Sequence, residues 1–514
     1  MSAGTVAGKP RPRARPRPGT AARGIRPGTA ARLGAVVGAV AVASLALDRI
    51  FAGHLLAVLM TGAAAAAAAV SAALARARGT WAAPLSVLAL AGYGTAAAAW
   101  TAHRADVPGP LPEVLAGAAA HALPRLLGAM LPVEPQPDTV LAPVAAAWLA
   151  ALLGAEVLLR SGRVLLALAP AAALFAGGLY LVGPNAAPAW WHAAAFAALT
   201  AAALARRRWP VAAAAGLAAG ALAAGALAPV LTARPADPRA HLDPPVVDSL
   251  DENPLARLSG WAMRPRQELF TVALSRPAGA RMRLAVLVDY DGVGWRVDGR
   301  YRHAGRTLPL PTGSGGTPPV RQEVTVTGLA GRLLPALARP HHVTGARVAF
   351  DADSGTLLGA PLRPGARYAV TSVPPPPPGD ALADAEAPHG PAVRRLLDLG
   401  ADPPPALAAL AERLGGEAVG AYARAAAVEE YLRTHYRLVA DAPSGHAYPN
   451  LEFFLFGPAH AGGQRGTSEQ FAAAYAVLAR LLGLPARVVV GFRLPAAGGP
   501  VRAGDAVAWP EVLF

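Results

Sequence analysis

The chain has 514 residues, which is more than one compact domain usually holds. Hydrophobic residues make up 54% of it and charged residues only 15%, whereas soluble domains carry about 25% charged residues. This composition indicates a membrane protein. The chain contains no cysteine, so disulfides, thiolate metal sites and thiol nucleophiles are excluded.

The formal net charge of +15 is concentrated at the N-terminus, where Lys9 and seven arginines lie within the first 32 residues. They alternate with proline and small residues, which cannot form a packed core. We therefore predict that residues 1–32 are a disordered cytoplasmic tail that contacts anionic lipid. No basic module with interleaved aromatic residues follows, so nucleic acid is not expected as a partner.

A helix that crosses the hydrocarbon core of a membrane needs about 20 apolar residues. Residues 33–232 contain seven apolar stretches of about that length and predict a transmembrane domain. The stretch Leu111–Leu131 is also apolar but includes charged residues, a histidine and a proline, so it predicts a helix at the membrane interface. The predicted spans are Leu33–Phe51, His54–Leu74, Trp81–Ala102, Val140–Leu159, Val164–Val182, Ala187–Ala205 and Val211–Leu231.

Arginines mark every second loop between these spans. Arg76–Arg78, Arg160–Arg163 and Arg206–Arg208 each carry two or three arginines, whereas the other loops carry few positive charges for their length. Positive loops stay on the cytoplasmic side of a membrane. The pattern predicts a multi-pass protein of the cell membrane, with the lipid bilayer as a partner, a cytoplasmic N-terminus and extracytoplasmic residues after about 232.

Residues 233–373 change to alternating or apolar runs between turn residues, which indicates a β-rich segment. Asp289–Gly292 before Trp295 is typical of a hairpin turn rather than a calcium loop, because the later ligands of such a loop are missing. His341 and His342 have no other ligands near them in sequence, so we expect neither a metal site nor a cofactor. The predicted strands are Leu269–Leu274, Met282–Val288, Gln322–Val326 and Arg347–Phe350.

A proline run within residues 374–388 predicts a linker before a C-terminal domain at 389–514. Thr467 and Gln470 have the spacing of a capping box at a helix start. Apolar residues then recur at helical spacing on one predicted buried face, and two strands should follow. That face consists of Phe471, Tyr475, Leu478 and Leu482; the strands are Ala486–Leu494 and Ala506–Phe514.

Residues 389–514 resemble the transglutaminase-like superfamily, in its bacterial, actinobacterial-type, membrane-anchored form. The motifs Gly466–Ala472, Leu478–Arg480, Gly483–Phe492 and Asp505–Val512 carry the resemblance. It implies a multi-span α-helical membrane domain followed by an α+β, papain-like extracytoplasmic domain, with a β-rich segment between them.

In this family a cysteine at the start of the helix is the nucleophile, because the helix N-terminus lowers the thiol pKa. A histidine on the next strand pairs with it, and an acidic residue on a further strand orients the imidazole. Here Ser468 stands at the nucleophile position and Val507 at the histidine position, while the acidic position would lie beyond Phe514. By resemblance, Trp509 lies beside this site, and Trp509 and Glu469 are candidate binding residues.

The leading hypothesis is a catalytically inactive transglutaminase-like domain that serves as a binding or scaffold module at the cell envelope, with a peptide or cell-wall strand as ligand. A serine hydroxyl is a weak nucleophile without a base, and valine cannot accept a proton. Glu469, His446 and His460 remain as replacement bases, although no motif supports any of them.

Two alternatives remain open. One is an active serine-dependent hydrolase or acyltransferase with a rebuilt base. The other is a transport or lipid-handling membrane unit with an accessory domain. Glu156 and His192, the ionisable residues nearest the interior of the spans, lie near span ends, which counts against transport.

The resemblance also implies a AAA-type ATPase as a partner and a further span after the domain. Because the chain ends on a predicted strand without a closing turn, we expect a truncated sequence.

Overall fold

The computed structural model describes residues 27–75, 82–105, 107, 110–187, 190–204, 239, 247, 253–277, 281–297, 299–311, 317–375, 382–400, 402–416, 418–440 and 442–514. Several predictions lie outside these residues. They are the basic tail up to residue 26, the seventh span Val211–Leu231, and the arginine loops Arg76–Arg78 and Arg206–Arg208.

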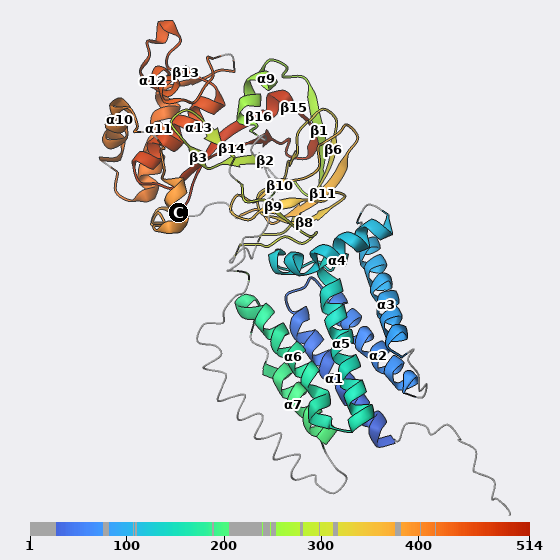
Figure 1. Ribbon diagram of the computed structural model, residues 1–514. Helices are drawn as coiled ribbons and strands as arrows, with labels where there is room; N and C mark the ends of the chain where they lie inside the picture. The colour runs from blue at the N-terminus through green and yellow to red at the C-terminus, as the bar shows by residue number, and fades with distance from the viewer. Residues whose placement is uncertain are drawn as a thin grey trace, which may run out of the picture. The chain divides into compact units, whose positions relative to one another are not determined.

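The described residues form two compact units, each of which is considered by itself. The first unit holds the described residues up to Arg49, those within Leu55–Ala97 and those within Leu141–Ala236. The second holds Ile50–His54 and the described residues within Ala98–Val140 and Asp237–Phe514. Figure 1 shows the helices of the first unit in blue to green.

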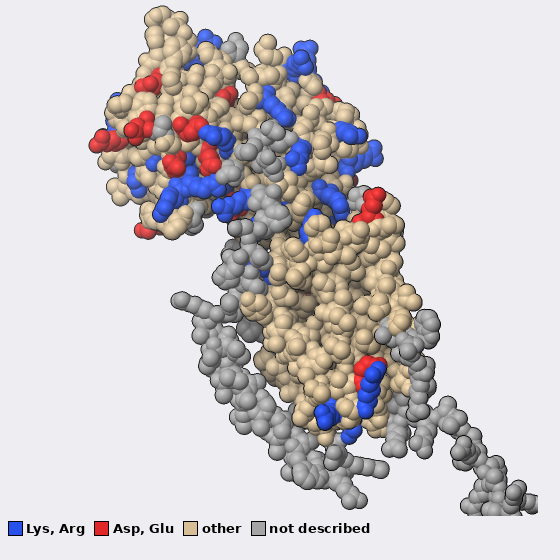
Figure 2. Space-filling model, in the orientation of Figure 1, with Lys and Arg blue, Asp and Glu red and all other residues tan. Residues whose placement is uncertain are grey.

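Among the described residues, five helices are long and apolar enough to cross a membrane, and they match the first five predicted spans. α1 starts at Pro27 rather than Leu33, because Pro27 suits a first helical position and the residues that follow it, up to Arg32, continue the helix. The visible face of this unit carries few charged side chains between its ends (Figure 2). The five helices are α1 (Pro27–Asp48), α2 (Leu55–Leu74), α3 (Ala82–Arg104), α5 (Pro137–Ser161) and α6 (Val164–Val182).

Two further helices complete this part of the chain. α7 (Trp190–Leu204) is shorter than the predicted span Ala187–Ala205, and residues 188–189 and 205 lie outside the described residues. α4 (Leu111–Gly128) confirms a helix where an interfacial helix was predicted. α4 belongs to the second unit, and its position at a membrane interface stays a prediction.

Small residues bring the helices of the first unit close together. A Cβ added to Gly154 of α5 would lie 2.6 Å from the backbone oxygen of Ala167 in α6. Such close approach is typical of helices in a membrane. Lipid tails are as apolar as the side chains there, so the helices associate through close van der Waals packing. Glu156, which is half-buried in the last turns of α5, pairs with the exposed Arg160 at 2.6 Å.

The second unit contains three main antiparallel sheets. Their strand orders are β15-β1-β6-β11-β8, β5-β9-β10-β7 and β16-β14-β2. The strands are β1 (Glu268–Leu274), β2 (Arg281–Leu287), β5 (Arg302–His303), β6 (Val320–Val326), β7 (Leu333–Leu334), β8 (Pro340–Thr344), β9 (Ala349–Asp351), β10 (Thr356–Leu358), β11 (Arg367–Ser372), β14 (Ala486–Arg493), β15 (Gly498–Arg502) and β16 (Ala506–Val512).

Two of these sheets contain strands from both sides of the linker predicted at 374–388. β2 precedes the linker but pairs with β14, and β15 follows it but pairs with β1 (Figure 1). The β-rich segment and the C-terminal segment therefore share one fold rather than stacking as two separate ones.

The predicted hairpin at Asp289–Gly292 is confirmed. β3 (Asp289–Tyr290) pairs with β4 (Trp295–Arg296). Asp291 Oδ1 accepts hydrogen bonds from the backbone N–H groups of Val293 and Gly294, and Gly292 adopts a φ of 86°. A positive φ favours glycine, so hydrogen bonds within the turn and the conformation of Gly292 account for its shape.

Of the helices after residue 390, α13 packs on the three-stranded sheet, where it contacts both β16 and β14. α10, α11 and α12 in turn pack on α13. The helices are η5 (Pro391–Leu396), α10 (Pro405–Gly416), α11 (Ala421–His435), α12 (Tyr448–Phe456), η6 (Ala459–Ala461) and α13 (Ser468–Leu481), and the short parallel strands β12 (Arg437–Leu438) and β13 (Arg465–Gly466) lie between them.

α13 is buried on more sides than the single face predicted for it. Leu478 is buried, whereas Phe471, Tyr475 and Leu482 are only partly buried against the core. Five alanines of the helix are at most 1% exposed, because their small side chains let strands and helices approach from several directions. They are Ala472, Ala473, Ala474, Ala476 and Ala479.

Candidate functional site

Ser468 is the first residue of α13, as the capping pattern predicted. Gln470 Oε1 accepts a hydrogen bond from the backbone N–H of Thr467 at 3.4 Å, which forms one half of the predicted capping box. Ser468 Oγ accepts a hydrogen bond from the backbone N–H of Ala508 at 3.2 Å. Ala508 lies on β16, at the edge of its sheet, so the hydroxyl ties the helix start to an edge strand.

Val507, the neighbour of Ala508, packs into a small apolar cluster. The side chain is 5% exposed and lies with Val286, Val489 and Trp509. These residues come from all three strands of the sheet, β2, β14 and β16. The position that the family resemblance assigns to an imidazole is therefore occupied by a hydrocarbon side chain in a hydrocarbon environment.

Two of the three candidate replacement bases lie together. His446 Nδ1 is 2.6 Å from Glu469 Oε1, and the Glu469 side chain is only 7% exposed. The backbone of His446 is held in turn, because the Tyr290 hydroxyl donates to its carbonyl oxygen at 2.7 Å. Burial raises the pKa of Tyr290, so this hydroxyl stays protonated and remains a donor. His460, the third candidate, is exposed on η6.

Trp509, a candidate binding residue by resemblance, is 9% exposed and takes part in a polar network. Its indole N–H donates to Glu511 Oε1 at 3.3 Å, and the guanidinium of Arg281 lies 5.2 Å from the ring centre. An arginine at this distance over an indole is a cation–π contact. Trp509 thus links the apolar cluster around Val507 to a charged cluster on the same sheet.

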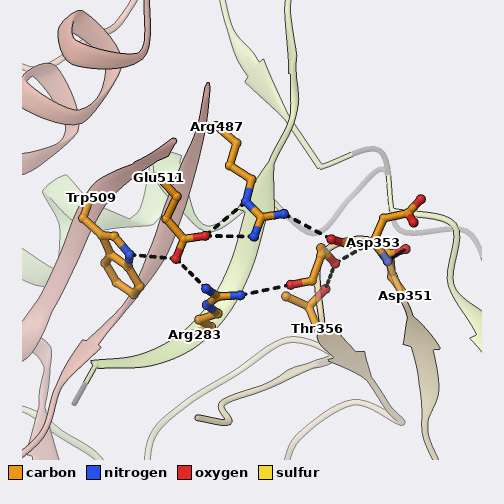
Figure 3. Close-up of polar contacts among 8 residues, drawn as sticks. Arg283, Asp351, Asp353, Thr356, Arg487, Trp509 and Glu511 are labelled. Carbon is orange, nitrogen blue, oxygen red and sulfur yellow. Dashed lines mark hydrogen bonds and ion pairs between the residues drawn. The ribbon is translucent and has the colours of Figure 1, made fainter. Parts of the chain in front are cut away.

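Glu511 is the centre of that charged cluster (Figure 3). Arg283 contacts Glu511 Oε1 at 2.6 Å, and Arg487 contacts Oε2 with two nitrogens at 2.9 and 3.1 Å. The same arginines also donate to the backbone oxygens of Ser354 and Asp353, at 3.4 and 3.1 Å. The cluster joins the three-stranded sheet to the loop between β9 and β10.

Burial and neighbouring charges together shift the pKa values of two acidic residues here in opposite directions. Burial opposes ionisation of Glu511, but Arg283 and Arg487 outweigh it, so the pKa of Glu511 lies below its usual value. Burial raises the pKa of Asp351, whose carboxylate accepts a hydrogen bond from Ser354. Ser354 in turn contacts Thr356, and Thr356 contacts the buried Tyr301 hydroxyl at 2.7 Å.

Sequence reasoning missed this cluster, although part of the signal was there. Arg487 and Glu511 are direct partners in the antiparallel pairing of β14 and β16, which are neighbours in the sheet and are separated in the sequence by the short strand β15. A register prediction for those two strands would have paired the two charges. Arg283 could not have been found in this way, because it reaches the cluster from a strand 228 residues away.

Arg480, a residue of the sequence motif, holds the other end of α13. Its guanidinium donates to the carbonyl oxygens of Ala486, Val288 and Asp398, and it lies 4.6 Å from the ring centre of Trp295. Burial lowers the pKa of Arg480 to about 10, against the opposing charges of Asp289 and Asp398, so it stays charged at neutral pH. A buried cation satisfied by three carbonyl groups is a structural anchor.

The site as a whole contains a hydroxyl at a helix N-terminus, an apolar side chain beside it, and an imidazole–carboxylate pair that begins one residue further along the helix. The hydroxyl accepts a backbone hydrogen bond, and the imidazole is engaged by Glu469. Among the described residues, no three histidines or acidic residues gather in a way that could hold a metal ion.

Two family models match the chain, one over each part of it. The family model described as the TgpA N-terminal domain matches residues 35–379, and that of the transglutaminase-like superfamily matches residues 408–514. No curated protein matches the chain.

Two solved structures are similar to the chain, and both are of the periplasmic domain of TgpA from Pseudomonas aeruginosa. The one bound to ethylmercury is 22% identical, covers 50% of this chain and 89% of that chain, and has a TM-score of 0.38. The other is 20% identical, covers 53% and 90%, and has a TM-score of 0.37. Similarity at this level carries no information about individual site residues.

The TgpA N-terminal domain model extends over more than half of the chain, from the first candidate span through the β-rich segment, and the second model begins within the helices that follow. The chain therefore belongs to the family of the TgpA N-terminal domain, and it continues into a domain of the transglutaminase-like superfamily.

Proposed function

We propose that this protein is a membrane-anchored transglutaminase-like protein whose C-terminal domain is catalytically inactive and serves as a binding or scaffold module outside the cytoplasm. The observation that carries the proposal is the environment of Val507. An apolar cluster surrounds the position from which a histidine would activate the nucleophile. Ser468 Oγ, meanwhile, accepts a hydrogen bond from a backbone N–H, and a donor of this kind cannot take the proton of the hydroxyl.

An activity assay on the full-length chain in detergent tests this proposal. The protein is incubated with a glutamine-containing peptide and a fluorescent amine, and separately with the peptide alone to detect hydrolysis. We expect wild type and Ser468→Ala to give the same background rate. Turnover that is present in wild type and lost in Ser468→Ala would contradict the proposal.

The absence of cysteine offers a matched positive control. Ser468→Cys creates a chain with a single thiol, whose pKa can be measured from the pH dependence of its alkylation by iodoacetamide. If the fold keeps the geometry that the family uses, adding Val507→His to Ser468→Cys should move the alkylation midpoint to lower pH, because an imidazolium stabilises a thiolate. An unchanged midpoint would show that Val507 is not the histidine position.

A second candidate function is an active serine-dependent hydrolase or acyltransferase, and the His446–Glu469 pair favours it. A carboxylate that holds Nδ1 leaves Nε2 as the nitrogen that could accept a proton, which is the arrangement a general base requires. If the assay detects turnover, His446→Gln should abolish it, whereas His460→Gln, on exposed η6, should not change it.

The location and partners of the module are further parts of the proposal. The positive-inside pattern supports an extracytoplasmic position for residues after about 232. A fusion of alkaline phosphatase after Phe514 should be active, and a fusion of green fluorescent protein at the same place should be dark. The proposed ligand is a peptide or cell-wall strand, with Glu469 and Trp509 as proposed binding residues, and a AAA-type ATPase is a proposed partner.

A further inference from the structure

A cavity of about 970 Å³ lies in the second unit, far in sequence from Ser468. One wall is formed by α4 and the first residues of α5, and the opposite wall by residues between His303 and Tyr368 of the β-rich segment. All the residues that line it belong to the same compact unit.

Positive charge dominates the lining. Four arginines face two carboxylates there, and two histidines lie among them. Arg125 is paired with one of these carboxylates, at 3.6 Å from Asp138. Within the described part of the chain, Arg347 and Arg367 have no ion pair and no side-chain hydrogen bond. The charged and imidazole groups are Arg125, Arg332, Arg347, Arg367, Glu113, Asp138, His121 and His303.

The pKa of His303 shows that charges from both walls of the cavity act on the same side chain. Burial lowers the pKa of His303, and the charges of Arg125 and Arg347 lower it further, while Asp138 acts in the opposite direction. Arg125 comes from α4 and Arg347 from the β-rich segment, so the two walls contribute to the same field. Such a field attracts an anion with several oxygen atoms, since guanidinium groups bind phosphate well.

Apart from Gln136 and Tyr368, the rest of the lining is apolar and suits a hydrocarbon chain. It includes residues from α4 and from the β-rich segment opposite, namely Val114, Ala118, Leu334, Val348, Leu358 and Leu362. A free inorganic anion would gain nothing from these residues, whereas an amphiphile would bury apolar surface on them.

Chain connectivity places the cavity at the end of two candidate spans. Pro137 and Asp138 line it and are the first two residues of α5, and Val107 lines it shortly after the end of α3 at Arg104. Both α3 and α5 are long and apolar enough to cross a membrane. Part of the lining is therefore close in sequence to the ends of two candidate spans, the level at which a lipid headgroup lies beside a spanning helix.

From the charged and apolar walls and their position at the ends of α3 and α5, we propose that this cavity binds a single lipid with a phosphate-bearing head, with the arginines on the phosphate and the apolar residues along the first part of the chain. The proposal does not depend on the transglutaminase-like site, and Ser468→Ala should leave lipid binding unchanged.

The test uses three probes on the full-length protein in a neutral detergent, with binding followed by native mass spectrometry and titration calorimetry. Farnesyl phosphate has the head and the chain, farnesol has only the chain, and inorganic phosphate has only the head group. We expect one farnesyl phosphate per chain, and binding of the other two at least about tenfold weaker, because each lacks one of the two contacts. Equal binding of inorganic phosphate would indicate a soluble anion site, and equal binding of farnesol a nonspecific apolar surface; either result would overturn the proposal.

Matched arginine variants locate the site. Arg347→Gln and Arg367→Gln should each weaken farnesyl phosphate binding by about fivefold, as expected for removing one arginine near an anionic head. Arg363→Gln removes the same charge from an exposed position that does not line the cavity, and should leave binding unchanged. A fourth variant, Ala346→Leu, should narrow the apolar part of the cavity and weaken the binding of farnesyl phosphate but not that of inorganic phosphate. Equal effects of Arg363→Gln and Arg347→Gln would place the lipid elsewhere.

Discussion

Glu511 shows at the scale of one residue how a short segment becomes part of the whole fold. It lies two positions after Trp509 on the same strand, and it pairs with Arg283 and Arg487, which come from strands on either side of the predicted linker. Removing the Glu511 carboxylate leaves the two arginines facing each other without an anion between them. The free-energy cost arises mainly from that uncompensated charge rather than from the loss of two hydrogen bonds.

We predict that Glu511→Gln lowers the free energy of unfolding by about 2–4 kcal/mol, somewhat less than for a fully buried pair, because the Glu511 side chain is 21% exposed. Urea denaturation of the full-length chain would measure the change. The matched control is Glu323→Gln, whose ion pair with Arg321 is exposed and should cost at most about 1 kcal/mol. Equal effects of the two variants would show that the Glu511 cluster contributes nothing special.

The lowered pKa of Glu511 also predicts how this contribution depends on pH. A carboxyl whose pKa is depressed in the folded state stabilises the fold above the pKa of the unfolded chain, which for glutamate is 4.5. That stability is lost as the pH falls through the depressed folded value. The stability difference between wild type and Glu511→Gln should therefore be constant from pH 6 to 7 and shrink below pH 4.5, and a difference that grows on acidification would contradict the assignment.

At the scale of elements, the contact between β14 and β2 depends on a residue without a side chain. A Cβ on Gly491 would lie 1.9 Å from the carbonyl oxygen of Met282 on β2 and 2.9 Å from the ring of Trp509. The backbone oxygen cannot move aside without breaking the pairing of the two strands. Gly491 is thus required for close approach between a strand of the β-rich segment and a strand of the C-terminal domain.

Gly491→Ala should therefore destabilise the second unit by about 2–3 kcal/mol or more, the cost of forcing atoms into a packed site. The measurement is the midpoint of thermal unfolding by circular dichroism. Gly260→Ala is the control, because Gly260 lies in the short helix α9 (Leu258–Ala262) with nothing within 4 Å of an added Cβ. That change should be neutral or stabilise by up to about 1 kcal/mol. A lower midpoint for Gly260→Ala than for Gly491→Ala would refute the explanation.

At the scale of the whole molecule, the shared strands make the β-rich segment and the transglutaminase-like domain dependent on each other. β2 would lose its pairing with β14, and β15 its pairing with β1, if either segment were removed. Interfaces made by strand pairing and a common core resemble a domain interior more than a contact between separate domains. The two segments are therefore expected to fold and unfold together.

A cut in the linker tests this dependence. A protease recognition sequence inserted within residues 374–388 allows the full-length chain to be cleaved after it has folded. We expect the two fragments to co-elute in size-exclusion chromatography and to unfold in the same transition as the uncut protein. Separation of the fragments without denaturant would mean that the shared strands do not hold them together.

The sequence by itself determined the features that depend on near neighbours along the chain. Five apolar helices among the described residues, the hairpin around Gly292 and the helix that begins at Ser468 could all be read from composition, turn chemistry and motif order. Each of these rests on periodicity or on residue identity, which the sequence contains directly.

Only the tertiary structure decided which distant residues meet. The Glu511 cluster joins residues 228 positions apart, the His446–Glu469 pair depends on how a loop returns to α13, and the positive field at His303 needs α4 to face the β-rich segment. The physical reason is that such contacts are set by strand register and by the packing of elements that are distant in the sequence. Neither element's own sequence indicates which distant element it will contact.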